Sequence, residues 1–254
     1  MSVSKSLERK TKMLKIIELN EVDSTNRYAL DNFSVLADFS LIIAKKQTMG
    51  RGRRGKSWVS PAGLNLYASF VIKDRNFGGA AASWAASLAA LSALRRTAQD
   101  ISFRLKWPND VYCRGKKIAG ILCETKSNNG NIFAGIVMGI GVNLNMPPED
   151  LVQIDKPATS LLAETGKSID IRTFAAVLGN ELIRYRDTIV INGIKPLYEE
   201  WKNENFIIGK NVHVSGDSID ADGTVIDIDG NGALILKSKE EILTLHSGDI
   251  TLLL

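Results

Sequence analysis

The sequence predicts an α+β protein with a larger N-terminal domain and a small C-terminal β-barrel. Three observations lead to this fold class. Strand-like and helix-like segments are mixed along the chain as far as residue 205. Within them, residues 77–99 are rich in alanine with leucines at helical spacing, which is typical of a core helix. Beyond residue 206, short alternating segments separated by turn signals indicate about five strands.

The other elements follow in chain order. Residues 1–12 are polar and basic and are expected to form a loose tail. A helix is expected to start at Asp23, Ser24 or Thr25, which are helix-capping residue types. Apolar runs predict strands at 13–22, 41–44, 64–72, 104–113, 117–125 and 132–145. The last two are expected to pair as an antiparallel hairpin across the turn at 127–131. Further helices are expected at 158–166, 171–189 and 196–204, which gives domains at 13–205 and 206–254.

Composition limits the class of protein. The 254 residues are 44% hydrophobic and 24% charged, which is ordinary for a soluble globular protein. Cys113 and Cys123 lie in strand-like segments, and the sequence shows neither a secretory signal nor an apolar run of membrane-spanning length. A cytoplasmic protein with reduced thiols, and no membrane partner, is therefore expected. The two histidines, His213 and His246, are too few and too late in the chain for a histidine-based triad or metal cluster.

Residues 50–57 match the Walker A pattern, with Gly50, Gly55, Lys56 and Ser57 at the required positions. A real P-loop continues as a helix whose N-terminal amides bind phosphate. Here Pro61 follows within the first turns, and the later residues favour a strand. The pattern therefore does not predict a P-loop NTPase.

Residues 47–58 nevertheless form a basic, glycine-rich segment. The net charge of the chain is only +4, but this stretch contains no acidic residue. Its glycines allow close approach of a ligand, and its arginines can bind phosphate oxygens in pairs. A solvated charge run and an arginine-glycine segment that binds nucleic acid are the alternatives.

Two further polar clusters interrupt apolar segments, where polar residues are costly unless they are used. The first is residues 23–26, for which plain helix capping is the commoner explanation. The second is residues 106–117, in which Lys106, Asn109 and Asp110 surround a proline and Lys117 begins the next apolar strand. A surface lysine and a turn aspartate would each be ordinary alone, but the combination indicates an anion site.

In this order, the segments "DSTN", "QTMGRGRRGKSW", "KWPNDV", "GKKIAGILCE" and "GIGVNLN" resemble the biotin protein ligases, or biotin-[acetyl-CoA-carboxylase] ligases, over nearly all of residues 14–254. The resemblance implies a class II aminoacyl-tRNA synthetase-like catalytic domain with a mixed sheet, followed by an SH3-like barrel. It implies ATP-dependent biotinylation of a lysine on a biotin carboxyl carrier protein, by way of biotinyl-5′-AMP. The substrates would be biotin and MgATP.

The resemblance also implies roles for individual residues. Arg53, Lys117 and Asp110 are the expected catalytic residues, with Asp110 also a candidate to place Mg²⁺. The expected biotin contacts are Ser24, Thr25, Asn26, Gln47, Arg51, Gly52, Arg53 and Lys117. The expected nucleotide contacts are Arg51, Arg53, Lys56, Trp58, Asn109 and Asn143.

Two departures from the family accompany these roles. Lys56 stands where the family commonly has arginine, which keeps the charge but loses the two-pronged contact. Bifunctional members carry an N-terminal DNA-binding domain for which this sequence has no room, so we expect no sequence-specific DNA binding. The oligomeric state is left open, and a homodimer through the central sheet is one alternative. A lipoate or octanoate ligase or transferase of the same fold is the nearest rival function.

Overall fold

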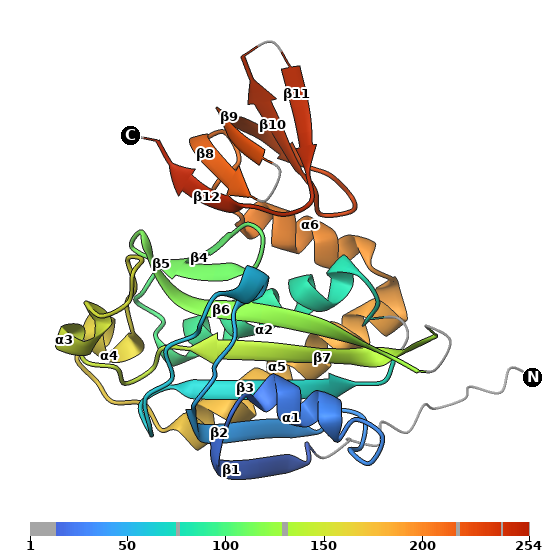
Figure 1. Cartoon of the computed structure of the whole chain (residues 1–254), viewed down its shortest axis with the longest axis vertical. Coiled ribbons are helices and arrows are strands. Elements are labelled where there is room, and N and C mark those ends of the chain that lie inside the picture. The colour runs from blue at the N-terminus through green and yellow to red at the C-terminus, as the bar shows by residue number, and fades with distance from the viewer. Residues whose placement is uncertain (1–13, 75–76, 129–131, 217–218, 240, 254) are drawn as a thin grey trace, which may run out of the picture.

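The computed structural model describes residues 14–74, 77–128, 132–216, 219–239 and 241–253, and the predicted tail at 1–12 lies outside them. Two sheets are stacked along the long axis of the molecule, with the smaller C-terminal sheet above the larger one (Figure 1). The fold is therefore a mixed α/β layer structure with an added antiparallel sheet, as the sequence predicts.

The larger sheet has seven strands in the order β1-β2-β3-β7-β6-β5-β4. Only β1 and β2 are parallel, so the sheet is mixed. Its strands are β1 (Ile16–Val22), β2 (Leu41–Gln47), β3 (Leu66–Ile72), β4 (Phe103–Lys106), β5 (Asp110–Cys113), β6 (Lys116–Ser127) and β7 (Phe133–Val142). The predicted hairpin is confirmed, because β6 and β7 pair in antiparallel register, although residues 129–131 of its turn lie outside the described residues.

Helices cover the two faces of this sheet unequally. The main hydrophobic core lies between the sheet and the long helices α2 (Ala80–Thr97), α5 (Ile171–Asn192) and α6 (Lys195–Glu204). The many alanines of α2 let it pack closely, and Trp84 is buried against Tyr198 and Trp201 at ring distances of 5.3 and 5.6 Å. Among the described helices, α1 (Thr25–Asp31) is the one that covers the opposite face, over a small apolar cluster. That second face is left partly open.

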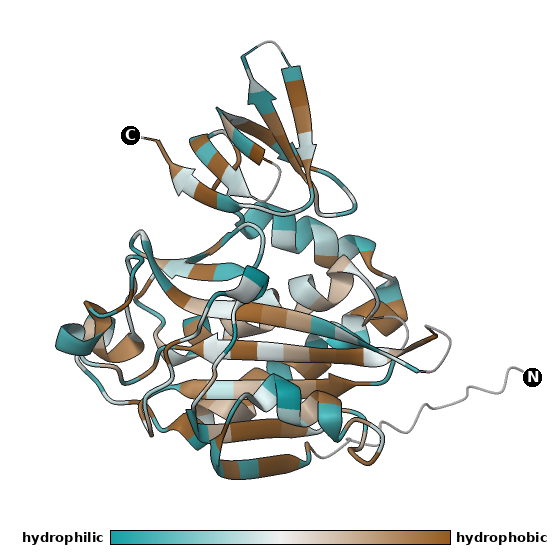
Figure 2. Cartoon of the chain, viewed as in Figure 1, coloured by the Kyte–Doolittle hydropathy of each residue, from teal (hydrophilic) through white to brown (hydrophobic). Residues whose placement is uncertain are grey.

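Hydropathy follows this arrangement, with hydrophobic residues concentrated along β3, β6 and β7 at the centre of the molecule (Figure 2). Two short helices, α3 (Pro148–Leu151) and α4 (Leu161–Thr165), lie at one end of the sheet. The sequence predicted α4 but missed α3. Among the described residues, none of the helices combines the length and apolar character needed to cross a membrane.

One predicted strand is wrong. Residues 104–113 form two strands, β4 and β5, that pair with each other across a turn at Trp107, Pro108 and Asn109. Proline has no amide hydrogen to donate to a sheet and therefore interrupts the strand. The turn brings Lys106 and Asp110 opposite each other at the end of the hairpin.

The C-terminal sheet has five antiparallel strands in the order β11-β10-β9-β8-β12, which confirms the predicted number. These are β8 (Asn211–Gly216), β9 (Ile219–Ile228), β10 (Leu234–Ser238), β11 (Glu241–Leu245) and β12 (Asp249–Leu252). The exact division of the chain near residue 206 stays a prediction.

The two sheets are joined through Trp107. Its side chain is only 1% exposed, and its indole nitrogen donates to the carbonyl oxygen of Gly232 at 2.9 Å. Gly232 lies in the turn between β9 and β10, with a positive φ of 83° that suits glycine. The turn of the first sheet is thus fixed directly to a turn of the second.

We expect Trp107→Phe to lower the free energy of unfolding by about 1–3 kcal/mol, because the carbonyl of Gly232 loses its buried donor and the smaller ring leaves a cavity. Urea unfolding followed by circular dichroism measures this change. An unfolding midpoint equal to that of the unsubstituted chain would show that the contact between the sheets contributes nothing.

Candidate active site

A cavity of about 790 Å³ opens on the α1 side of the large sheet and extends to the C-terminal sheet. All thirteen site residues predicted from the sequence line it, although they come from five separate segments. They are Ser24, Thr25, Asn26, Gln47, Arg51, Gly52, Arg53, Lys56, Trp58, Asn109, Asp110, Lys117 and Asn143. The fold therefore brings the whole predicted set together.

Glycines leave the floor of the cavity free of side chains. Gly120 on β6 pairs with Gly141 on β7, and Gly139 lies two residues earlier on the same face. A Cβ atom at Gly141 would lie 2.5 Å from the ring of Trp58, and one at Gly139 would lie 2.3 Å from Oδ1 of Asn26. The floor is thus open only because these strand positions have no side chain.

A network of polar side chains forms one end of the cavity, and it is neutral except for the carboxylate of Glu124, which accepts from Asn26 Nδ2 at 2.8 Å and pairs with Arg51. Ser69 Oγ lies 2.8 Å from Thr25 Oγ1 and 2.6 Å from Asn26 Oδ1. The amide nitrogen of Asn26 donates to the carbonyl oxygen of Leu122 at 3.0 Å, and the backbone amide of Thr25 donates to Gln47 Oε1 at 2.9 Å. Such a network fixes donors and acceptors in place before a polar ligand arrives.

The N-terminus of α1 supplies two of these groups, but not through capping. Ser24 occupies the N-cap position with extended backbone, yet its side chain makes no capping hydrogen bond. Ser24, Thr25 and Asn26 are each only 3% exposed. Three buried polar residues at one helix start are therefore better explained by the cavity than by the helix.

The glycine-arginine loop, residues 50–58, supplies part of the cavity lining. It contains one 3₁₀ turn, η1 (Arg53–Gly55), and no helix follows Ser57 before β3 begins, which confirms that the Walker A match is not a P-loop. An isolated bridge between Arg51 and Ser57 closes the loop on itself. The conformation differs from the phosphate-binding helix start that the pattern would require.

Side chains of this loop contact the cavity walls. Arg51 pairs with Glu124 at 2.7 Å, Arg53 donates to Asn109 Oδ1 at 3.2 Å, and Lys56 pairs with Asp249 of β12. Burial is the main cause that lowers the pKa of Arg53, which remains charged at neutral pH. These contacts argue against a purely solvated charge run.

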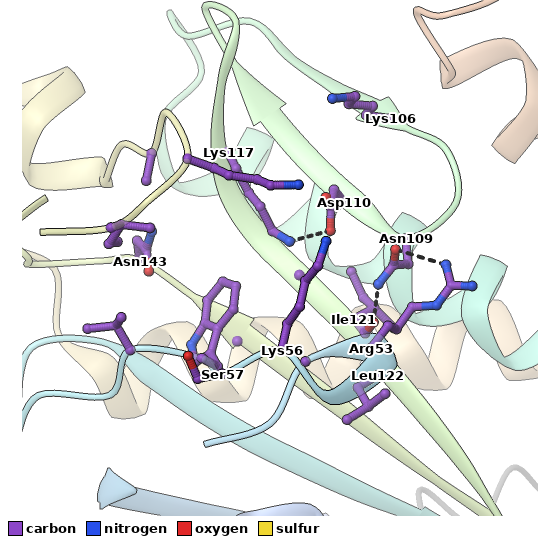
Figure 3. Close-up of a pocket in the computed structure, with 18 of the residues that line it drawn as sticks. Arg53, Lys56, Ser57, Lys106, Asn109, Asp110, Lys117, Ile121, Leu122 and Asn143 are labelled. Carbon is purple, nitrogen blue, oxygen red and sulfur yellow. Dashed lines mark hydrogen bonds and ion pairs between the residues drawn. The ribbon is translucent and has the colours of Figure 1, made fainter. Parts of the chain in front are cut away.

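Lys117 and Asp110 face each other at the centre of the cavity, with the Lys117 Nζ to Asp110 Oδ1 distance at 2.5 Å (Figure 3). Lys117 Nζ also lies 5.4 Å from the ring centre of Trp58. In the same view, Lys56 extends from the loop toward this pair. Asn109, next to Asp110, is fixed by donating to the carbonyl oxygen of Ile121.

Asn143 is placed differently from the other predicted residues. Its amide nitrogen donates to the carbonyl oxygen of Thr159 at 3.0 Å, and its own backbone pairs with Ile118 and Leu161. The side chain thus holds the segment before α4 against the end of β7. Its expected nucleotide contact stays a prediction.

Charge in the cavity is strongly unbalanced. Seven basic residues line it, namely Arg51, Arg53, Arg54, Lys56, Lys106, Lys117 and Lys156, against the three acidic residues Asp110, Asp155 and Asp249. One end is neutral and rich in hydrogen-bonding groups, and the other is cationic. The arrangement suits two ligands bound side by side. One would place an uncharged polar group at the hydrogen-bonding end, and the other would be a polyanion at the cationic end.

Several residues that line the cavity or contact its lining were missed or left without a role by sequence reasoning. Lys106 and Glu124 belong to quoted motifs, so their positions gave a usable signal. Ser69 is a lone polar residue on an apolar strand, a weaker signal of the same kind. Lys156 and Asp249 lie in ordinary polar surroundings in the sequence, and only the fold brings them to the cavity.

Comparison with known proteins defines the class. A family model described as "Biotin/lipoate A/B protein ligase family" matches residues 19–143, and one described as "Biotin protein ligase C terminal domain" matches residues 207–253. The chain is 36% identical over 235 residues to "Bifunctional ligase/repressor BirA" of Escherichia coli (strain K12), covering 91% of this chain and 72% of that protein.

A further relative and a solved structure are both named as biotin ligases. The "Biotin--[acetyl-CoA-carboxylase] ligase" of Paracoccus denitrificans is 34% identical over 225 residues, which cover 86% of this chain and 92% of that protein. The solved structure "Biotin protein ligase from Aquifex aeolicus in complex with biotin and ATP" superposes with a TM-score of 0.79 at 28% identity, covering 94% of this chain and 98% of that one. The chain belongs to the biotin protein ligase family.

Proposed function

We propose that this chain is a biotin protein ligase that joins biotin to a lysine of a biotin carboxyl carrier protein at the expense of ATP. One observation carries the proposal: five motif segments converge on a cavity with a neutral hydrogen-bonding end and a cationic end. The neutral end suits the ureido ring of biotin, and the cationic end suits its carboxylate beside a triphosphate.

In the first step, a carboxylate oxygen of biotin attacks the α-phosphorus of ATP. A new oxygen–phosphorus bond forms, the bond to the bridging oxygen of the β-phosphate breaks, and pyrophosphate leaves with that electron pair. The protein contributes positioning and charge more than covalent chemistry. Arg53 and Lys117, which line the cavity near Asn109 and Asp110, are the residues we assign to the carboxylate and α-phosphate oxygens.

In the second step, the amine of the carrier lysine attacks the carbonyl carbon of the mixed anhydride. An amide bond forms, the bond between that carbon and the phosphate oxygen breaks, AMP leaves and the nitrogen loses a proton. The anhydride hydrolyses readily, so water must be excluded until the carrier arrives. The glycine-arginine loop lies across the cavity, and we assign it this shielding role.

The remaining roles follow the two ends of the cavity. Thr25, Asn26 and Gln47, with Ser24 beside them, would hold the ureido ring, while Arg51 and Gly52 would close over biotin. Lys56, Trp58, Asn109 and Asn143 would contact the nucleotide. Lys56 now has a partner that the sequence did not reveal, because it pairs with Asp249.

Magnesium would enter with the nucleotide as MgATP. Among the described residues no group of three or more histidine, cysteine, aspartate or glutamate side chains is arranged to hold a metal ion. Asp110 therefore fits Mg²⁺ only as one ligand beside phosphate oxygens, and Lys117 competes for it.

Cellular location, dimerisation and DNA binding are three further expectations. Free Cys113 and Cys123 are compatible with a reducing, cytoplasmic setting. β1 is an edge strand of the large sheet, with Ile16 40% exposed, and it offers an edge for a homodimer. Absence of sequence-specific DNA binding stays a prediction from the sequence.

ATP-dependent transfer of labelled biotin to a carrier domain tests the proposed function. We expect labelling of the domain that depends on ATP and disappears when its acceptor lysine is replaced by arginine. Labelling with lipoate or octanoate but not with biotin would instead support the rival of the same fold.

Asn26→Ala is expected to raise the KM for biotin at least about tenfold, because the amide that bonds Leu122 and Ser69 is lost from the neutral end, while the KM for ATP stays within about twofold. Steady-state kinetics with each substrate varied separately measures both constants. Asn32→Ala is the matched control, because Asn32 bonds to the carbonyl oxygen of Tyr28 at the far end of the same helix. Equal effects of the two substitutions would argue against the assigned end.

A further inference from the structure

Four lysine side chains from four segments meet where the cavity reaches the C-terminal sheet. They are Lys56 of the glycine-arginine loop, Lys106 at the end of β4, Lys117 of β6 and Lys156 from the segment between α3 and α4. The carboxylates that act on them are Asp110 and Asp249. With Asp155, which also lines the cavity, four lysines face three carboxylates, so positive charge is in excess even before the arginines of the loop are counted.

Each carboxylate is already engaged. Asp249 pairs with Lys56 and lies 3.6 Å from Lys156, while Asp110 pairs with Lys117. Lys106 donates to the hydroxyl of Tyr112 at 3.2 Å and lies 4.7 Å from the centre of its ring. Within the described residues, no carboxylate oxygen forms an ion pair with Lys106.

Lys106 and Lys117 are half-buried, whereas the side chains of Lys56 and Lys156 are 47% and 59% exposed. Burial is the largest cause that lowers the pKa of both Lys106 and Lys156, and neighbouring lysines lower each pKa further. Burial opposes ionisation of Asp249 as well, but the hydrogen bond and charge of Lys56 and the charge of Lys156 bring its pKa below the ordinary value. Clustered, desolvated cations are unfavourable unless an anion joins them.

We propose that this lysine cluster binds the pyrophosphate part of ATP, and that Asp249 occupies the place of a phosphate oxygen when the nucleotide is absent. The inference rests on the proposed function and adds a subsite to it. A carboxylate and a phosphate both accept hydrogen bonds from lysine ammonium groups, so one can be exchanged for the other. Binding of nucleotide then separates Asp249 from Lys56 and Lys156.

The exchange gives the C-terminal sheet a defined part in the reaction. Asp249 lies at the first position of β12, so the second sheet supplies the competing carboxylate. Because it competes with phosphate oxygens, Asp249 weakens the binding of pyrophosphate and favours its release after adenylation. It also holds the glycine-arginine loop through Lys56 while the site is empty. Asp249 is thus a positioning residue for the loop.

Calorimetric titration of the full chain with inorganic pyrophosphate, and separately with AMP, tests the inference. We expect Lys106→Met and Lys156→Met each to weaken pyrophosphate binding at least tenfold and to leave AMP binding within twofold. Asp249→Asn is expected to tighten pyrophosphate binding at least threefold. A merely structural Asp249 would give the opposite sign, since loss of its ion pairs would loosen the site.

The controls separate folding from binding. Lys156 has a side chain 59% exposed in a loop segment, so its substitution leaves the core intact even if a change at Lys106 in β4 disturbs the strand. Lys46→Met removes the same charge from a residue that pairs with Glu21 outside the cavity lining, and should change nothing.

Failure of the subsite and failure of the proposed function give different results. Pyrophosphate binding by the wild-type chain requires neither biotin nor a carrier, so it can succeed where biotinylation fails. The subsite is wrong if the wild-type chain does not bind pyrophosphate, if Lys156→Met binds it like the wild type, or if Asp249→Asn binds it equally or more weakly.

Discussion

We expect Arg53→Ala to slow the formation of biotinyl-5′-AMP by about 100- to 1,000-fold, the loss seen when one charged or hydrogen-bonding group is removed from a developing oxyanion. The guanidinium of Arg53 is partly buried, and this burial is the main cause of its lowered pKa. It is oriented by Asn109, next to Asp110. A second consequence is that more of the intermediate escapes into solvent and hydrolyses.

Rapid-quench measurement of the first half-reaction, with the intermediate separated into bound and free fractions, reports both effects. Arg172→Ala is the matched control. Arg172 lies at the start of α5, and its exposed side chain pairs with Glu18 of β1, so the substitution removes the same charge elsewhere. Rates of both half-reactions close to those of the unsubstituted chain would remove Arg53 from the mechanism.

We expect Gly139→Ala to weaken biotin binding by at least about 30-fold, equivalent to about 2 kcal/mol of misplaced hydrogen bonds. The new Cβ would lie 2.3 Å from Asn26 Oδ1 and 2.8 Å from its Nδ2, too close for Asn26 to stay. Asn26 is held by Ser69 and by the carbonyl oxygen of Leu122, so its movement disrupts the whole neutral end. Overpacking costs about 1–3 kcal/mol of stability as well.

Isothermal titration with biotin, together with urea unfolding, separates these two losses. In the double variant Gly139→Ala, Asn26→Ala the clash is removed, so the stability lost by Gly139→Ala should be largely recovered while biotin binding stays weak. Gly230→Ala serves as control, because a Cβ there meets nothing within 4 Å. Full biotin affinity in Gly139→Ala would contradict the proposed location of the ureido ring.

Much of the site was predictable because its residue types conflict with their local pattern. Lys117 begins an apolar strand, which indicated a use beyond folding, whereas Thr25 and Asn26 at a helix start were equally compatible with capping and received their roles only from the family resemblance. The lengths and apolar periods of α2 and α5 indicated the helical layer in the same way. These are local signals that need no knowledge of distant contacts.

Other parts depend on long-range contacts that local patterns do not encode. Asp249 is the first residue of an ordinary short strand, and its place beside Lys56 depends on how the two sheets are joined. The split of residues 104–113 depended on the weight given to Pro108 within an apolar run. The Walker A pattern is a misleading local signal, because its residues are present but the helix that would bind phosphate does not follow them.

ATP–pyrophosphate exchange in the presence of biotin, compared with lipoate and octanoate, tests the central claim most directly. Exchange reports reversible adenylation of the acid alone and requires no carrier. We predict exchange that depends on biotin and falls with Arg53→Ala. Exchange supported by lipoate or octanoate and not by biotin, or no exchange with any of the three acids, would contradict the assignment of this cavity to biotin and ATP.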